Sequence, residues 1–410
     1  MATNGSSGNG SSDGGGAGAP AALEGVRVLD FTQMMLGPLA TQTLADLGAD
    51  VVKVERPGNG EWMRAMPMLG EFVGKDSAAF HAFNRNKRAI AVDLKSEEGR
   101  ALLLEIVAEF DVVTENFRAG VMDRLGLGYD DFRAVKPDII YASGSGWGQR
   151  TEMAKKNYPG QDLLIQAMSG VMYNTGKGGD QPTPCGTPIA DFAASQAMVS
   201  GILAALIARD RHGIGQRVEV DLYSATLNLM AQENFAVLNQ GIHLERSEAG
   251  VATPWNDAPY GPHPCSDGYV AIAMCPLPKL ADLLDEPRIA ALHGFRDRDE
   301  VKRLIDARTA AMTKVALLDL LRGADVWCAP VRDSTEAMGE LVETGSDRLI
   351  ELDHPEAGTV KAVACPITLS ATPADRREAA PTVGQHTDEV LDELIGPERR
   401  AALREAGAIG

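Results

Sequence analysis

Aromatic residues and cysteines are scarce in this sequence, and their scarcity removes several classes of protein. Phe, Trp and Tyr make up 5% of the 410 residues, which favours a helix-rich α/β chain over a sandwich of short aromatic strands. The five cysteines are scattered, with no CxxC motif and no paired histidines. We therefore expect reduced thiols, a cytoplasmic location and no bound metal.

Basic residues are also in deficit. The 39 Lys and Arg stand against 57 Asp and Glu, a formal net charge of −18. Such a surface repels nucleic-acid phosphates and anionic lipids, so we expect neither nucleic acid nor a membrane as a partner. A polyphosphate ligand would need its own local cluster of Arg and Lys.

Long apolar runs and targeting signals are missing as well. No run of apolar residues is expected to be long enough to span a bilayer. The start of the chain has neither the basic residues nor the apolar stretch of a signal peptide. Its Gly- and Ser-rich composition predicts a disordered tail over residues 1–21.

After the tail, the hydrophobic pattern predicts alternating strands and helices. Strands are expected at residues 26–31, 51–55, 89–93, 111–114, 139–142 and 217–222. Helices are expected at residues 39–47, from Ser96 as N-cap to Phe110, and at residues 191–211. The alternation predicts an α/β protein with a Rossmann-like open parallel sheet and right-handed crossovers.

A change of composition divides the chain after residue 240. Residues 22–240 are predicted to form the first part of a large Rossmann-like domain. Residues 241–330 begin with a segment rich in Pro, Asn and Gly, a linker signal, and continue as a smaller domain. Residues 331–410 are predicted to be a return linker and the C-terminal part of the large domain.

The two common nucleotide-binding fingerprints are missing. The turn after the first predicted strand reads TQMMLGP, with Gly37 as its one glycine, and no GxxxxGK[ST] sequence occurs. The close backbone approach to pyrophosphate that those glycines allow is therefore not encoded. This argues against NAD and against a P-loop nucleotide.

Several motifs occur in a recognisable order. They include RVLDFTQMMLGP, VVKVERPGNG, NRNKRAIAVDLKSEEGR, TENFRAGVMDRLGLG, GTPIADFAASQAM and GQHTDEVLDEL. In this order they resemble the family III CoA transferases, among them formyl-CoA transferase and carnitine CoA-transferase, whose fold the α-methylacyl-CoA racemases share. The resemblance extends over nearly all of the chain after the tail.

The resemblance implies that Asp191, in PIADFAA, is the catalytic nucleophile. If the family resemblance is set aside, the commonest role of an Asp at the start of a helix is to cap its N-terminus. Both roles place the carboxylate at a positive helix end, from which we expect a lowered pKa and an ionised group. An ionised carboxylate can attack a thioester and form a mixed anhydride, then an enzyme–CoA thioester.

Gln161 distinguishes a predicted CoA transferase from a predicted racemase. The resembling racemases carry a histidine in a GHD motif, where this chain has Gly160-Gln161-Asp162. Racemisation needs a group that exchanges protons with the α-carbon, and Gln161 cannot do so. We expect Gln161 to bind an acyl or carboxylate oxygen, with a packing role as the open alternative.

The resemblance also implies ligands for CoA, which is a substrate here and not a permanently bound cofactor. The implied phosphate and adenine contacts are Arg56, Lys95, Asn116, Phe117 and Arg124. The backbone N–H of Met35 would stabilise an oxyanion beside the substrate.

The family fold implies two subunits shaped as rings that interlock into a dimer. The predicted function is transfer of CoA from a donor such as succinyl-CoA to a small carboxylic acid. Two alternatives stay open: a 2-methylacyl-CoA racemase-like isomerase, and a non-catalytic subunit in a heteromer with a paralogous chain. The sequence does not identify the acceptor acid.

Overall fold

A six-stranded parallel sheet forms the centre of the large domain in the computed structural model, which describes residues 19–374 and 376–410. Most of the predicted tail therefore lies outside the described residues. The strand order is β3-β2-β1-β4-β5-β6, and the register places Val28 beside both Val51 and Val112. The strands are β1 (Arg27–Asp30), β2 (Asp50–Glu55), β3 (Arg88–Ala91), β4 (Val112–Glu115), β5 (Ile140–Ser145) and β6 (Arg217–Asp221). This confirms the Rossmann-like sheet.

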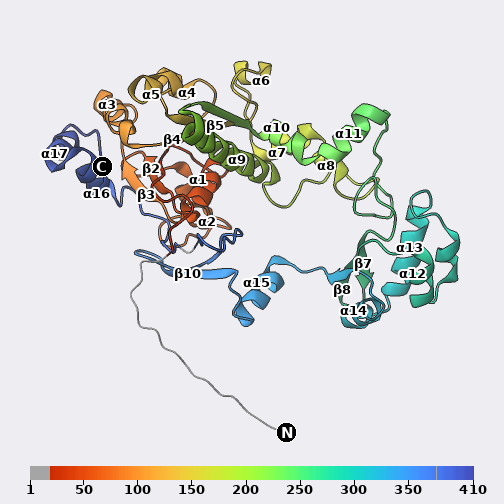
Figure 1. Ribbon diagram of the computed structural model, residues 1–410. Coiled ribbons are helices and arrows are strands. Elements are labelled where there is room, and N and C mark those ends of the chain that lie inside the picture. The colour runs from red at the N-terminus through yellow and green to blue at the C-terminus, as the bar shows by residue number, and fades with distance from the viewer. Residues whose placement is uncertain (1–18, 375) are drawn as a thin grey trace, which may run out of the picture.

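Helices cover both faces of this sheet, as the alternation of side chains along β1 requires (Figure 1). Val28 packs into a core with α1 (Leu36–Asp46), α9 (Ile189–His212) and α10 (Leu222–Leu229). Leu29 points to the opposite core, formed with α3 (Glu97–Ile106), α5 (Tyr129–Val135), α16 (Thr387–Ile395) and α17 (Pro397–Glu405). The end of the chain therefore returns to the large sheet.

Helix α9 corrects the expectation that no apolar run is long enough to span a bilayer. By length and composition alone, its 24 residues would suffice. Its inner face, which includes Ala194, Met198 and Ile202, is buried against the sheet. A helix that packs centrally in a domain needs the same apolar composition as a membrane helix, so composition does not separate the two.

A smaller domain stands apart from the large sheet, and the chain reaches it and leaves it through separate segments (Figure 1). It holds an antiparallel sheet of β7 (Gly261–Cys265), β8 (Gly268–Ile272) and β9 (Cys328–Pro330). Around the sheet lie α12 (Leu277–Leu283), η3 (Pro287–Ala291), α13 (Arg298–Thr309) and α14 (Lys314–Gly323), which share one apolar core. The outgoing segment contains α11 (Ala231–Gln240), and the returning one contains α15 (Ser334–Glu343).

The remaining elements lie mainly around the large sheet. A hairpin of β10 (Leu349–His354) and β11 (Gly358–Val363) follows α15. The short helices are η1 (Trp62–Ala65), α2 (Ala78–Phe83), η2 (Val107–Glu109), α4 (Val121–Leu125), α6 (Glu152–Lys155), α7 (Asp162–Ser169) and α8 (Val171–Asn174).

Candidate active site

The predicted ligand residues follow one edge of the large sheet. Each one comes after the carboxyl end of a parallel strand: Lys95 after β3, Arg56 after β2, Met35 after β1, Asn116 after β4 and Gln161 in the loop beyond β5. Because the strand order is 3-2-1-4-5, these residues lie in that same order across the sheet. Parallel open sheets bind ligands at this edge, near the strands where the order reverses, here β1 and β4.

Asp191 is not the N-cap of α9, which corrects the capping alternative. The N-cap is Pro188, and Asp191 lies in the first turn. The capping acceptor is instead Asp162 at the start of α7, whose Oδ1 accepts from the N–H groups of Ala190 at 2.7 Å and Asp191 at 3.4 Å. The Asp191 carboxylate is thus left free of a capping role, and the backbone N–H of Leu36, in α1, lies close enough to act against the rise of its pKa.

The electrostatic environment of Asp191 also differs from the expectation. Burial, together with repulsion from Asp162, raises the pKa of Asp191 to about 7, although the Leu36 N–H acts in the opposite direction. The expected lowering by the helix dipole was wrong because a half-charge at a helix end is a smaller effect than desolvation. Near neutral pH the carboxylate is therefore partly protonated, and its ionised form is more basic than an ordinary Asp.

Two glycines determine where α7 begins. Gly146 follows β5 and Gly160 precedes α7, and a Cβ on Gly146 would lie 2.3 Å from the Gly160 Cα. Only glycine at both positions allows this approach of the two backbones. The contact places exposed Gln161, the N-cap of α7, directly before Asp162.

The turn from β1 into α1 is held by Asn116. Its Oδ1 accepts from the Gln33 N–H at 2.7 Å, and its Nδ2 donates to the Gln33 carbonyl at 2.6 Å. Met35 is the N-cap of α1, so its N–H and that of Leu36 have no acceptor within the helix. Asn116 therefore connects the expected CoA loop after β4 to the expected oxyanion turn after β1.

The other expected CoA contacts are spread along the sheet edge. Arg56, Lys95 and Arg124 have exposed side chains, and Phe117 is partly buried against the core. Arg56 lines a cavity of about 650 Å³ together with Trp62, and its Nε donates to the Gly60 carbonyl. The three cations follow the ends of β3, β2 and β4, with β1 between the last two, so the expected phosphate contacts are distributed along this edge of the sheet.

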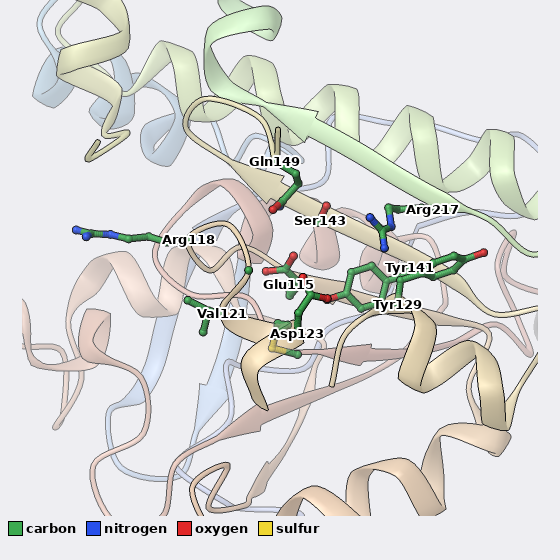
Figure 2. A pocket seen from close by; sticks show the side chains of 11 residues that line it. Glu115, Arg118, Val121, Asp123, Tyr129, Tyr141, Ser143, Gln149 and Arg217 are labelled. Atoms are coloured by element: carbon green, nitrogen blue, oxygen red, sulfur yellow. The ribbon is translucent and has the colours of Figure 1, made fainter. Parts of the chain in front are cut away.

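Glu115, which sequence reasoning missed, lies beneath the expected CoA loop. Its Oε2 accepts the Phe117 N–H at 2.8 Å, and its other oxygen faces a small cavity of about 20 Å³ (Figure 2). Burial, with repulsion from Asp123, raises the pKa of Glu115 to about 8. Figure 2 also shows the Arg118 side chain directed away from this cavity. The TENF motif contained Glu115, but only the fold reveals that it is buried.

Among the residues that the structure describes, Asp76, His81 and His354 form a cluster of metal-ligand type. However, His354 Nδ1 accepts the N–H groups of Glu356 at 3.1 Å and Ala357 at 3.0 Å. The neutral ring then carries its proton on Nε2, the nitrogen that faces the cluster, and has no lone pair there for a metal. His81 Nδ1 and His354 Nε2 are buried without a hydrogen-bond partner among the described residues, and we assign no metal to the cluster.

Comparison with known proteins identifies the family. The profile described as CoA-transferase family III matches residues 23–387. Mouse succinyl-CoA:glutarate CoA-transferase is 31% identical over 91% of this chain and 86% of its own length. Formyl-CoA:oxalate CoA-transferase of Bradyrhizobium sp. is 33% identical over 95% of this chain and 97% of its own. A crystal structure of a CAIB/BAIF family protein from Brucella suis aligns with a TM-score of 0.79 at 30% identity, over 92% of this chain and all of that one.

The chain belongs to CoA-transferase family III. It is therefore an enzyme of the CoA-transferase class.

Proposed function

We propose that this enzyme moves CoA from an acyl-CoA donor to a small dicarboxylate through covalent intermediates on Asp191. The observation that carries the proposal is the position of this carboxylate. It is partly buried at the carboxyl edge of the sheet and lies near the N-terminus of α1. It does not cap a helix, because the N-cap of α9 is Pro188. The elevated pKa makes its ionised form a better nucleophile than an exposed carboxylate.

The proposed chemistry is an exchange of bonds at three carbonyl carbons, those of the donor acyl group, Asp191 and the acceptor acid. A carboxylate oxygen of Asp191 attacks the thioester carbonyl, the C–S bond breaks, and CoA leaves as a thiolate beside a mixed anhydride. The thiolate attacks the Asp191 carbonyl, which expels the donor acid and leaves an aspartyl–CoA thioester. The acceptor carboxylate then attacks this thioester, and the same steps run in reverse. The N–H groups of Met35 and Leu36 are suited to stabilise the oxyanions.

The substrate proposal rests on relatives. Their names pair succinyl-CoA with glutarate in mouse and with mesaconate in Haloarcula hispanica, and formyl-CoA with oxalate in Bradyrhizobium. The named acceptors are all dicarboxylates. We accordingly propose succinyl-CoA as donor and a dicarboxylate as acceptor.

Mass spectrometry tests the covalent step. The protein is incubated with succinyl-CoA and then quenched with hydroxylamine, which should convert an activated Asp191 into a hydroxamate. The expected modification lies on the peptide that contains Asp191 and is missing in Asp191→Asn. Asp210→Asn, an exposed carboxylate at the other end of the same helix, serves as the control and should keep the modification. Transfer activity with an unmodified Asp191 would refute the mechanism.

We also infer that the working unit is a dimer, because large apolar side chains on the helix of Asp191 and on α11 face solvent. Phe192, next to the nucleophile, is 48% exposed, and Phe235 and Leu238 on α11 are 68% and 83% exposed. Such a surface is typical of a protein interface. Light scattering after gel filtration should give about 87 kDa, twice the 43.5 kDa chain.

The variant Leu238→Glu should shift the dimer towards the single chain, because it would place a charge in the apolar surface. A wild-type mass of one chain would contradict the dimer. A second chain that co-purifies would instead favour the heteromer.

A further inference from the structure

In the turn between β1 and α1, three successive backbone N–H groups each donate to a different side chain. Thr32 donates to Asp30 at 2.9 Å, Gln33 to Asn116 at 2.7 Å and Met34 to Glu61 Oε2 at 2.8 Å. The next two N–H groups, those of Met35 and Leu36, are left for the site. Leu36 is the one that reaches Asp191. The direction of these last two groups therefore depends on how the three before them are held.

Met34 is the strained residue of this turn. Its φ is +65°, in the left-handed region that residues other than glycine, Asn and Asp seldom adopt. Such a conformation persists only where the surroundings hold it. The peptide that joins Met34 to Met35 carries the Met35 N–H, so a rotation about the Met34 dihedral angles would turn that N–H away.

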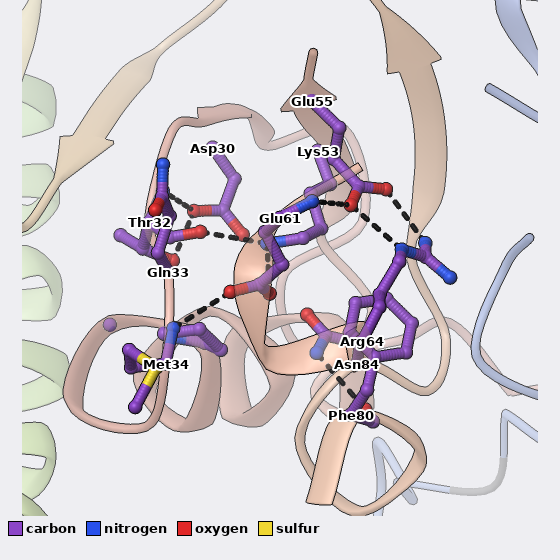
Figure 3. Close-up of polar contacts among 12 residues, drawn as sticks. Asp30, Thr32, Gln33, Met34, Lys53, Glu55, Glu61, Arg64, Phe80 and Asn84 are labelled. Carbon is purple, nitrogen blue, oxygen red and sulfur yellow. Dashed lines mark hydrogen bonds and ion pairs between the residues drawn. The ribbon is translucent and has the colours of Figure 1, made fainter. Parts of the chain in front are cut away.

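Glu61 and Lys53 supply the surroundings that hold Met34 (Figure 3). The Glu61 carboxylate accepts the Met34 N–H with one oxygen, and Lys53 Nζ lies 3.0 Å from the other. Lys53 Nζ also donates to the Thr32 carbonyl at 2.7 Å. The pair therefore binds the backbone at both ends of the turn, at the Thr32 carbonyl and at the Met34 N–H. Both side chains are almost completely buried, at 2% and 0% exposure.

The pair is itself anchored to the second strand. The Glu61 N–H donates to Glu55 Oε1 at 2.9 Å, and Arg64 binds both oxygens of Glu55 at 2.8 and 2.7 Å. Arg64 in turn reaches Asp76 at 2.6 Å. A buried network in which every charge has a partner is rigid, which suits it to fix a strained turn.

We propose that Glu61, paired with Lys53, is a positioning residue that holds Met34 in the left-handed conformation and so aims the Met35 and Leu36 N–H groups at the reacting centre. Glu61 acts through the turn and has no recorded contact with Asp191. The inference rests on the proposed function, in which Asp191 is the nucleophile. Preorganised donors are worth most when an oxyanion develops, so the pair should affect kcat more than KM.

Glu61→Gln tests this role because the Met34 N–H donates to one oxygen of Glu61 and the Lys53 ammonium forms an ion pair with the other. A glutamine has one oxygen, and its NH₂ group would meet either the Met34 N–H or the Lys53 ammonium. We expect kcat to fall by about 10- to 100-fold, less than the roughly 100- to 1000-fold loss when an oxyanion donor is removed, because the N–H groups remain but are misdirected. KM for acyl-CoA should be nearly unchanged. Glu286→Gln is the matched control, a buried and arginine-paired carboxylate of the small domain, and should retain wild-type kcat.

A second substitution distinguishes an effect of Glu61 on the conformation of Met34 from a general effect on the stability of the protein. Met34→Gly accepts the left-handed conformation without help, so the double variant Glu61→Gln/Met34→Gly should recover a large part of the lost kcat. If the double variant is no faster than Glu61→Gln, or if Glu61→Gln lowers only the melting temperature, the proposal is overturned.

A pair of single variants covers the case in which Glu61→Gln fails to fold. Met34→Val, whose β-branch disfavours the left-handed region, should be at least about tenfold slower than Met34→Gly. Equal rates would overturn the proposal. Asp191→Asn, assayed alongside, reports on the nucleophile by itself: if it stays active, the proposed function fails whatever the Glu61 and Met34 variants do.

Discussion

Asp191→Asn is expected to abolish CoA transfer and at the same time to stabilise the folded protein at pH 8. Asparagine cannot form the anhydride, so kcat should fall by about 10⁴-fold or more. Its oxygen can still accept the Leu36 N–H, and its NH₂ group can face Asp162, the neighbour that repels the native carboxylate. The two effects have opposite signs because the same burial that makes the group reactive makes its charge costly.

The sign of the pH dependence follows from the raised pKa. An acid whose pKa rises from 3.8 to about 7 on folding binds more protons when folded, so stability falls as the pH rises through that range. The shift corresponds to at most about 4 kcal/mol at pH 8, and little of it is present at pH 4. Melting curves of wild type and Asp191→Asn should therefore diverge as the pH rises from 4 to 8. Curves that keep a constant separation would contradict the raised pKa.

The same pKa predicts how activity changes with pH. The protonated carboxyl cannot attack a thioester, so kcat/KM for the acyl-CoA should rise through about pH 7 and then level off. A profile that is flat from pH 5 to 8 would mean that the carboxylate ionises in its ordinary range.

Asp30→Asn should be strongly destabilising, by about 3–5 kcal/mol, because it breaks a buried ion pair from one side. Asp30 is fully buried and accepts hydrogen bonds from Thr32, Thr41, Thr114 and Lys87. Burial alone would raise its pKa, but Lys87 and Lys53 outweigh burial and lower it. An amide would place two N–H groups among these donors and leave the Lys87 ammonium without its carboxylate.

Urea unfolding at pH 7 measures this loss. Asp353→Asn is the control: Asp353 is an exposed residue of β10 with Thr359 as its partner, and its substitution should change the free energy of unfolding by less than about 0.5 kcal/mol. If Asp30→Asn unfolds at the wild-type urea concentration, the ion pair with Lys87 contributes little and the argument for a rigid charge network loses its basis.

The start of α1 shows where local sequence reasoning fails. The helix was predicted from residue 39 because Gly37 and Pro38 are typical of a turn, yet it begins at Leu36. The first N–H groups of a helix need no intrahelical acceptor, so a proline fits in the first turn. The error hid the fact that the Leu36 N–H is at the helix end and faces Asp191. The sequence also predicts a single helix from Ser224 to about Asn239, whereas the structure has two, α10 and α11, separated at Met230.

Local signals predicted other elements well. The apolar spacing near the end of the chain predicts a helix at residues 387–395, which agrees with α16 (Thr387–Ile395), and Ser96 caps α3 by accepting the Gly99 N–H. In the small domain, the sequence predicts a helix at residues 314–322, which corresponds to α14 (Lys314–Gly323), capped by Thr313. Caps and helical periodicity are visible in the sequence because they act within a few residues.

The sequence by itself determined the order of strands and helices, the α/β class, and the identity of Asp191 as the carboxylate to test. The first two follow from periodicity, and the third follows from a family resemblance carried by motifs whose parts are neighbours in the chain. Only the tertiary structure decided that Asp162 caps the helix of Asp191, that the pKa of Asp191 rises, and that Glu61 holds the turn beside it. Burial and charge act through space, and Asp162 and Glu61 lie 28 and 27 residues from the atoms they bind.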